Sequence, residues 1–456
     1  MREKIHIKAS HILITSAIIM IYFQIYWHYW FVKLLGGYVV NTLLPIIVLF
    51  CSFVFKEFIS ANWNGRLRRT IFYLSIPLFC YVFFASVSIA LNEEGLNNIK
   101  SFFIYIYSPV IIFLSIWGLY IYRKNENIKF TLNVLFILSV IFSIYVTIIF
   151  SVDPQDLLVM PTIETNRGKI ATTSGGTYGV GDMEAVRYTI PGISSTLYGP
   201  LLVPLIFVGF YFKKYTKGKL IHFIYTVLIL FLIFCVLKTV SRGPLIAMFA
   251  GITYLGWRNL LKTKEIVFIA SVLVISFLTF AKLALLRLFI TIAIFIPFDI
   301  PFLDKAIDIT DLLKDPRVEV TPETFSQILA HPFMGMGMTN LINLQELSYG
   351  KDHNNYLSIA ASFGSLTLVF YLLFLFLLFI MTQKAIKRLS WNPTSKDLGI
   401  VLSAGCLSLI IYLNFAPAEF HFIWIWFGLA AAWLRNCEDE FLLRKPAIHK
   451  LCSKKI

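Results

Sequence analysis

The sequence predicts an all-α, polytopic membrane protein, on two observations. Of its 456 residues, 58% are hydrophobic and only 14% are charged, whereas soluble domains carry about 25% charged residues. Apolar runs of about 20 residues recur along the chain, and a helix of that length spans the hydrocarbon core of a bilayer. We therefore expect residues 1–456 to form a single membrane domain.

The apolar runs divide the chain into about twelve transmembrane helices, so that both termini lie on the same side of the membrane. Polar or Gly- and Pro-containing segments separate the runs, as expected of connections between spans. The predicted helices are roughly 10–29, 38–55, 71–91, 101–122, 130–150, 190–212, 220–237, 243–257, 266–281, 355–381, 398–414 and 420–434.

The net charge of +15 is explained by topology. Most of the 40 Lys and Arg residues fall at the N-terminus, in every second connection and in the tail 435–456. Cytoplasmic segments carry such an excess of basic residues. We therefore expect an inner-membrane protein with cytoplasmic termini, a mixed-charge tail that lies on the surface or is disordered, and no nucleic-acid partner.

Two long loops are predicted on the opposite, periplasmic side. The first, 151–189, contains a Gly-, Ser- and Thr-rich run that we expect to be mobile unless it is tied down. It ends with Arg187 and Tyr188 at the mouth of the sixth helix. The second, 282–354, has apolar residues at helical spacing, which predicts short amphipathic helices. Loops of this length are commonly functional. None of the six cysteines lies in either loop, so the loops have no disulfide framework.

The turn between the seventh and eighth predicted helices contains Ser241-Arg242-Gly243-Pro244. Pro244 fits the first turn of a helix, which needs no backbone donor. Arg242 is thereby placed beside a helix N-terminus, where free N–H groups favour an anion such as phosphate. Lys238 precedes the same turn. An interface-anchoring arginine is the alternative interpretation of Arg242.

The second loop ends with two further motifs, His331-Pro332-Phe333-Met334-Gly335-Met336-Gly337 and Asp352-His353-Asn354. His353 enters the next helix from the water side, which is a suitable position for a general base. A helix-capping or interface histidine is the alternative. We interpret His331 as a structural residue in a turn.

The ordered set of motifs resembles the O-antigen ligase/polymerase superfamily. The resemblance rests on Ser241-Arg242-Gly243, on Arg317 followed by the His331–Gly337 block, and on His353-Asn354 with Leu357. It covers roughly residues 187–381. It implies a membrane glycosyltransferase that uses an undecaprenyl-diphosphate-linked glycan as donor at the periplasmic face, without a metal ion or another cofactor.

The resemblance also implies roles for individual residues. Arg187 and Arg242 would hold the diphosphate, because guanidinium groups bind phosphate oxygens bidentately. His353 would act as the base for the acceptor hydroxyl. The expected substrate-binding residues are Arg317, Asp352, Lys238, Tyr188 and Asn354, of which Asp352 could instead orient the imidazole of His353.

Three functions remain open. The first is a surface-polysaccharide polymerase whose acceptor is a lipid-linked repeat unit, with a chain-length regulator protein as a possible partner. The chain is rich in Phe, Ile, Lys and Asn, which is typical of an AT-rich gene. Such genes are common in polysaccharide clusters, so this composition favours the polymerase. The second is the ligase that transfers polysaccharide to the lipid A core. The third is a twelve-helix transporter, which the lack of internal repeats and of charges at mid-span disfavours.

Overall fold

The computed structural model describes helical and loop residues in the ranges 9–23, 69–92, 106–118, 122, 124–152, 195–279, 324–338, 354–415 and 421–452, and strand residues 163–165, 168–170, 177–180 and 183–186. The predicted helix at 38–55 and most of the second loop lie outside these residues. All other predicted helices fall, in whole or in part, on segments that are helical.

The helices have the following bounds: α1 Ala9–Tyr22, α4 Arg69–Asn92, α6 Ser108–Gly118, α7 Asn125–Val152, α8 Ser195–Tyr215, α9 Lys219–Lys238, α10 Arg242–Trp257, α11 Thr263–Thr279, α17 Asn355–Phe363, α18 Ser365–Arg388, α19 Pro393–Tyr412, the 3-10 helix η3 Leu413–Phe415, and α20 His421–Cys452. Residues 324–330 are also helical.

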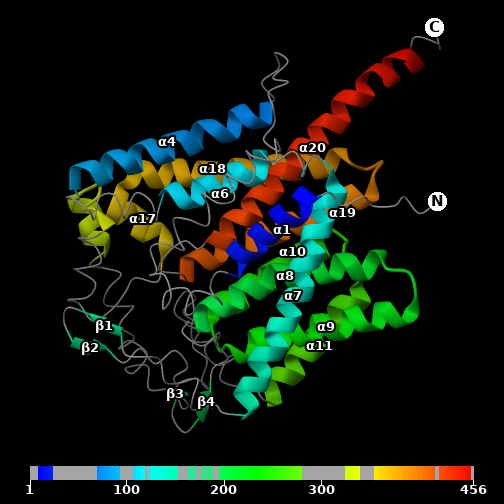
Figure 1. Cartoon of the computed structure of the whole chain (residues 1–456), viewed down its shortest axis with the longest axis horizontal. Helices are drawn as coiled ribbons and strands as arrows, with labels where there is room; N and C mark the ends of the chain where they lie inside the picture. Colours follow the sequence, from blue (N-terminus) through cyan, green and yellow to red (C-terminus); the bar gives the residue numbers. More distant parts are fainter. Residues whose placement is uncertain are drawn as a thin grey trace, which may run out of the picture.

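Two groups of helices lie on either side of α19 and α20 (Figure 1). In the first group α4 packs on α18 and α6 packs on α20. In the second group α8 contacts α9, α10 and α19, and α7 joins it along α8 and α9. The two central helices therefore connect the groups into one bundle.

Large aromatic side chains opposite glycines build the centre of the bundle. Trp426 and Trp433 of α20 are fully buried. They face Gly405 and Gly399 of α19, where an added methyl group would overlap the indole rings. Small residues of this kind let helices approach closely in membrane proteins. The Trp433 indole N–H donates to the carbonyl of Ser395 at 3.0 Å, so the ring is also held in place by a polar contact.

Five of the described helical segments are long and apolar enough to cross a membrane: Tyr73–Asn92, Asn125–Ile148, Lys219–Lys238, Ser365–Arg388 and Pro393–Phe415. Segments of at least 18 apolar residues match the thickness of the hydrocarbon core. The chain is accordingly a polytopic membrane protein. Twelve crossings remain a prediction.

The first loop contains short strands that were not expected from the sequence. Strands β1 (Ile163–Thr165) and β2 (Gly168–Ile170) pair antiparallel, with Ile163 opposite Ile170. Strands β3 (Thr177–Val180) and β4 (Met183–Val186) form a second antiparallel pair, with Thr177 opposite Val186. Two residues separate the strands of each pair, which is the commonest hairpin spacing. Part of the Gly-rich run is thus tied down by strand pairing.

The predicted continuous helix 355–381 is instead two helices, α17 and α18, which meet at Gly364. Gly364 has φ 92° and ψ 159°, a conformation that side-chain-bearing residues rarely adopt. Hydropathy did not reveal this break because α17 and α18 are both predominantly apolar.

The predicted surface tail 435–456 is also different in the structure, because α20 continues to Cys452. Arg435 is only 1% exposed and donates a hydrogen bond to the carbonyl of Trp117 in α6. The side-chain amide of Asn436 donates to the carbonyl of Tyr122 at 2.7 Å. These two hydrogen bonds hold α20 against the end of α6 and the connection to α7. The polar character of Arg435 and Asn436 alone does not indicate that they are buried.

One end of the bundle carries most of the described basic side chains. Lys213 at the end of α8 pairs with Glu265 at the start of α11 at 2.9 Å, and Lys214 pairs with Asp397 at the start of α19 at 2.5 Å. Lys387 and Arg388 close α18 on this side. We call it the basic end. The positive-inside rule predicts that it faces the cytoplasm.

Candidate functional site

A three-residue turn, Thr239–Ser241, connects α9 to α10 at the end of the bundle opposite the basic end. Val240 has φ 50°, which is strained for a β-branched residue. The Thr239 hydroxyl donates to the carbonyl of Val236 at 2.7 Å and accepts the N–H of Ser241 at 3.3 Å. The turn is therefore fixed by its own hydrogen bonds.

Helix α10 begins at Arg242, one residue before the predicted start at 243, with Pro244 in its first turn. Arg242 is half-buried. A methyl group on Gly243 would stand 2.7 Å from Cβ of Phe415, and one on Gly199 would stand 2.6 Å from Pro244. Two glycines therefore allow the start of α10 to lie directly against η3 and α8, which fixes the backbone that carries Arg242.

Asn354 caps the start of α17. Its side-chain oxygen accepts hydrogen bonds from the backbone N–H groups of Tyr356 at 3.0 Å and Leu357 at 3.2 Å. This is the preferred N-cap arrangement, in which the side chain satisfies donors that the helix leaves open. The capping role explains why an Asn precedes this helix. Substrate binding by Asn354 remains a prediction.

The His331–Gly337 block docks onto the break between α17 and α18. The N–H groups of Met336 and Gly337 donate to the carbonyls of Ala361 and Ser362 at 2.8 and 3.0 Å. On the other side of the break, Ser365 N–H donates to the carbonyl of Pro332 at 2.8 Å. The block thus pairs the backbone groups that the interrupted helix leaves open.

Two glycines make this docking possible. A methyl group on Gly335 (φ 65°) would overlap the carbonyl of Ser362, and one on Gly364 would overlap the carbonyl of Phe333. The glycines in this motif are therefore required for close backbone contact. His331 itself is exposed, and its carbonyl accepts the N–H of Gly335 at 3.0 Å, which agrees with a structural role in a turn.

The end of α4 holds the docked block from a third side. The buried hydroxyl of Ser88 is placed to donate to the carbonyls of Met334 and Ser362, the latter at 3.1 Å. The side-chain amide of Asn92 donates to the carbonyls of Met334 and Gly335 at 3.2 and 3.3 Å. Neither residue was predicted from the sequence. Their signal is a pair of polar side chains four residues apart on one face of an apolar helix.

The starts of α10 and α17 contact the same neighbour, the end of α19 with η3. The Tyr356 hydroxyl donates to the carbonyl of Ile410 in α19 at 2.7 Å. Gly243 lies against Phe415 of η3. Neither helix has an acidic residue in its first turn. Two helix N-termini are therefore held against the same neighbour at one end of the bundle, and the partial positive charge of such termini favours an anion. We call this region the motif end.

The structure describes three of the predicted site residues. Arg242 and Asn354 stand at the two helix starts of the motif end. Lys238 is the last residue of α9, with its ammonium 5.7 Å from the centre of the Phe234 ring. Arg187, Tyr188, Arg317, Asp352 and His353 lie outside the described residues, and His353 directly precedes Asn354 in the sequence.

The described residues contain no cluster of three His, Cys, Asp or Glu side chains that could hold a metal ion. Near the motif end, the cationic side chains of Lys238 and Arg242 flank the turn before α10. Two such cations suit an anionic ligand.

Comparison with known families gives one match in this part of the chain. Residues 226–372 match the family described as O-Antigen ligase. The matched segment begins within α9 and ends within α18, so it contains the turn before α10, the docked block and the start of α17. No curated protein matches the chain. This match agrees with the resemblance to the O-antigen ligase/polymerase superfamily over residues 226–372.

Proposed function

We propose that the motif end is the active site of a membrane glycosyltransferase that uses an undecaprenyl-diphosphate-linked glycan as donor. One observation carries the proposal most strongly. The Ser241-Arg242-Gly243 turn and the cap of α17 are distant in sequence, yet both are fixed against the end of α19, within the segment that matches the O-antigen ligase family.

The diphosphate of the donor binds at the start of α10. There it meets the partial positive charge of the helix N-terminus and the guanidinium of Arg242, which stays charged at any relevant pH. Lys238, across the three-residue turn, adds a second cation. Arg187, at the end of the first loop, completes the clamp. Preorganised cations of this kind stabilise the charge that develops on the leaving diphosphate.

His353 accepts the proton of the acceptor hydroxyl. The hydroxyl oxygen attacks the anomeric carbon, the bond from that carbon to the phosphate oxygen breaks, and the lipid diphosphate leaves with the bonding electron pair. The anomeric centre is inverted by this direct displacement. Asp352 orients the imidazole or binds the sugar, and Arg317, Tyr188 and Asn354 contact the glycan. The reaction requires no metal ion and no nucleotide.

The acceptor is a second lipid-linked repeat unit, which makes the protein a surface-polysaccharide polymerase. The site faces the periplasm of the bacterial inner membrane, both termini are cytoplasmic, and a chain-length regulator protein is the expected partner. The description of the matching family favours a second candidate, the O-antigen ligase, whose acceptor is the lipid A core. Both reactions use the same donor chemistry and the same residues.

Complementation of a polysaccharide-deficient strain separates these functions. With matched expression, wild type should restore a ladder of surface glycan on a gel, while Arg242→Ala and His353→Ala should leave one repeat unit on the lipid core. If the variants leave bare core and long polymer accumulates on its lipid carrier, the protein is the ligase. If both variants give a full ladder, the proposed site is wrong and the transporter hypothesis is favoured again.

A further inference from the structure

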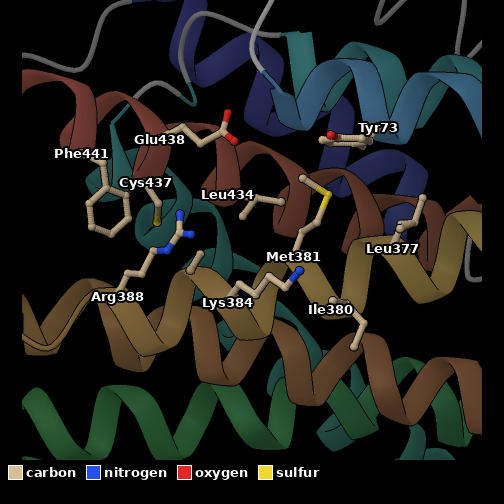
Figure 2. A pocket seen from close by; sticks show the side chains of 11 residues that line it. Tyr73, Leu377, Ile380, Met381, Lys384, Arg388, Leu434, Cys437, Glu438 and Phe441 are labelled. Carbon is tan, nitrogen blue, oxygen red and sulfur yellow. The ribbon is translucent and has the colours of Figure 1, made fainter.

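A cavity of about 350 Å³ opens at the basic end, between the start of α4, the end of α18 and the middle of α20. It is on the opposite end of the bundle from Arg242 and Asn354, and none of its lining residues belongs to the candidate active site. Figure 2 shows the lining side chains, which come from α18 on one wall and from α20 and Tyr73 on the other.

The side chains of α18 that line the cavity change from apolar to basic toward the end of the helix. Leu377, Met381, Lys384 and Arg388 line the cavity at intervals of three or four residues, so they share one face of the helix. The first two are apolar and lie deeper in the span, and the last two are basic and exposed at the end of the helix. The wall therefore matches an amphiphile whose hydrocarbon part lies deeper in the membrane than its anionic group.

The opposite wall adds Leu434, Cys437 and Phe441, together with one carboxylate, Glu438. In Figure 2 the nitrogen ends of Lys384 and Arg388 point into the space between α18 and α20, whereas the Glu438 carboxylate is turned toward the side of Tyr73. Two cations and one carboxylate leave an excess of one positive charge in the lining. A ligand with a single negative charge would balance it.

We propose that this cavity binds one anionic phospholipid from the cytoplasmic leaflet. The phosphate of the lipid lies between Lys384 and Arg388, and an acyl chain follows Met381 and Leu377 into the span. Basic pockets between helices on the cytoplasmic side are suited to lipid head groups, and the positive-inside rule assigns the basic end to that side. The lipid holds α18 and α20 together at the basic end, which is the end of α18 far from its break with α17.

The test is native mass spectrometry of the purified full-length protein with equal amounts of phosphatidylglycerol and phosphatidylcholine. Wild type should retain one phosphatidylglycerol in preference to phosphatidylcholine. The double variant Lys384→Gln/Arg388→Gln should lower that preference about 30-fold, since each basic residue near anionic lipid contributes roughly 5-fold. Lys387→Gln is the matched control, because Lys387 is an exposed cation on the same helix turn that does not line the cavity.

Two further measurements keep the proposal falsifiable. Met381→Trp fills the apolar part of the cavity and leaves both cations in place, so it should also expel the phosphatidylglycerol. Inorganic phosphate in excess should not displace the lipid, because it cannot use the apolar wall. The proposal is overturned if the double variant and Lys387→Gln behave alike, if phosphatidylcholine is retained equally well, or if inorganic phosphate competes.

Discussion

The hydroxyl of Ser88 in α4 donates a hydrogen bond of 3.1 Å to the carbonyl of Ser362, the next-to-last residue of α17. The same hydroxyl contacts the carbonyl of Met334 in the docked block. A single buried side chain thus joins a membrane helix, the block and the break between α17 and α18. Because His353 directly precedes Asn354, the N-cap of α17, we expect this junction to influence the position of the predicted base.

Ser88→Ala should therefore lower the rate of glycan transfer by about 10-fold or more, since small displacements of catalytic groups have effects of this size. It should lower the free energy of unfolding by only about 1–2 kcal/mol. Ser86→Ala is the matched control, because the Ser86 hydroxyl donates to Val82 within its own helix at 2.6 Å. Equal transfer rates for the two variants, measured per folded protein, would contradict a positioning role for Ser88.

Asn354→Ala should destabilise α17 by about 1 kcal/mol through the lost cap and should also lower transfer. Asn392→Ala removes the equivalent cap of α19 at the basic end, where Asn392 accepts the N–H of Ser395 at 3.2 Å. It should cost similar stability and leave transfer unchanged. Thermal unfolding and transfer assays on both variants check this pair.

Asn354→Ser separates the two roles of Asn354. Serine caps a helix about as well as asparagine, so this variant should keep transfer if capping is the main role. A variant that is stable yet as inactive as Asn354→Ala would instead show that the amide binds substrate.

Gly364→Ala should destabilise the protein more than Gly218→Ala. Both glycines have strongly positive φ, 92° and 107°, in a backbone region that costs an alanine about 1–3 kcal/mol at either position. At Gly364 the methyl group also overlaps the carbonyl of Phe333, whereas nothing lies within 4 Å of it at Gly218. The overlap adds about 1–3 kcal/mol. Equal losses in chemical unfolding would show that the block is not docked as described.

The Lys213–Glu265 pair makes stability depend on pH at the basic end. Burial alone would raise the pKa of Glu265, but the N–H of Lys262 and the ammonium of Lys213 hold the pKa below its ordinary value of 4.5. A carboxylate with a lowered folded-state pKa stabilises the protein above its unfolded-state pKa. That contribution is lost as the pH falls through the folded-state value.

Wild type should therefore lose more thermal stability than Glu265→Gln when the pH is lowered from about 5 to about 3. Lys213→Met removes the main charged partner and should reduce the same dependence. Parallel stability curves for wild type and Glu265→Gln would contradict this account of the pair.

The sequence predicted the elements that hydropathy and turn chemistry determine locally. The spans α4, α7, α9 and α18 follow from apolar length, and the start of α10 follows from Pro244 one turn into an apolar run. Arg242 was placed correctly for that reason. The resemblance to the O-antigen ligase/polymerase superfamily is confirmed by the match over residues 226–372.

The elements that were missed depend on contacts between distant parts of the chain. Ser88 and Asn92 acquire their role from carbonyls more than 240 positions away in sequence. The break at Gly364 exists because the block at 332–337 can pair its open backbone groups. Arg435 is buried where its guanidinium donates a hydrogen bond to a carbonyl of α6. None of these partners can be identified from local pattern.

The most direct test of the central claim measures glycan transfer by the purified full-length protein in proteoliposomes. The donor is the lipid-linked oligosaccharide of the parent strain, and the readout is the release of undecaprenyl diphosphate. Arg242→Ala should slow release by about 100- to 1,000-fold, because it removes a cation from the leaving diphosphate. His353→Ala should slow it by about 100- to 10,000-fold, because it removes the base.

Arg258→Ala is the matched control, because Arg258 closes the same helix, α10, at the basic end. It should retain the wild-type rate per folded protein. This pattern is the one that an active site at the motif end predicts. Release at the wild-type rate by Arg242→Ala and His353→Ala, or an equal loss in Arg258→Ala, would contradict it.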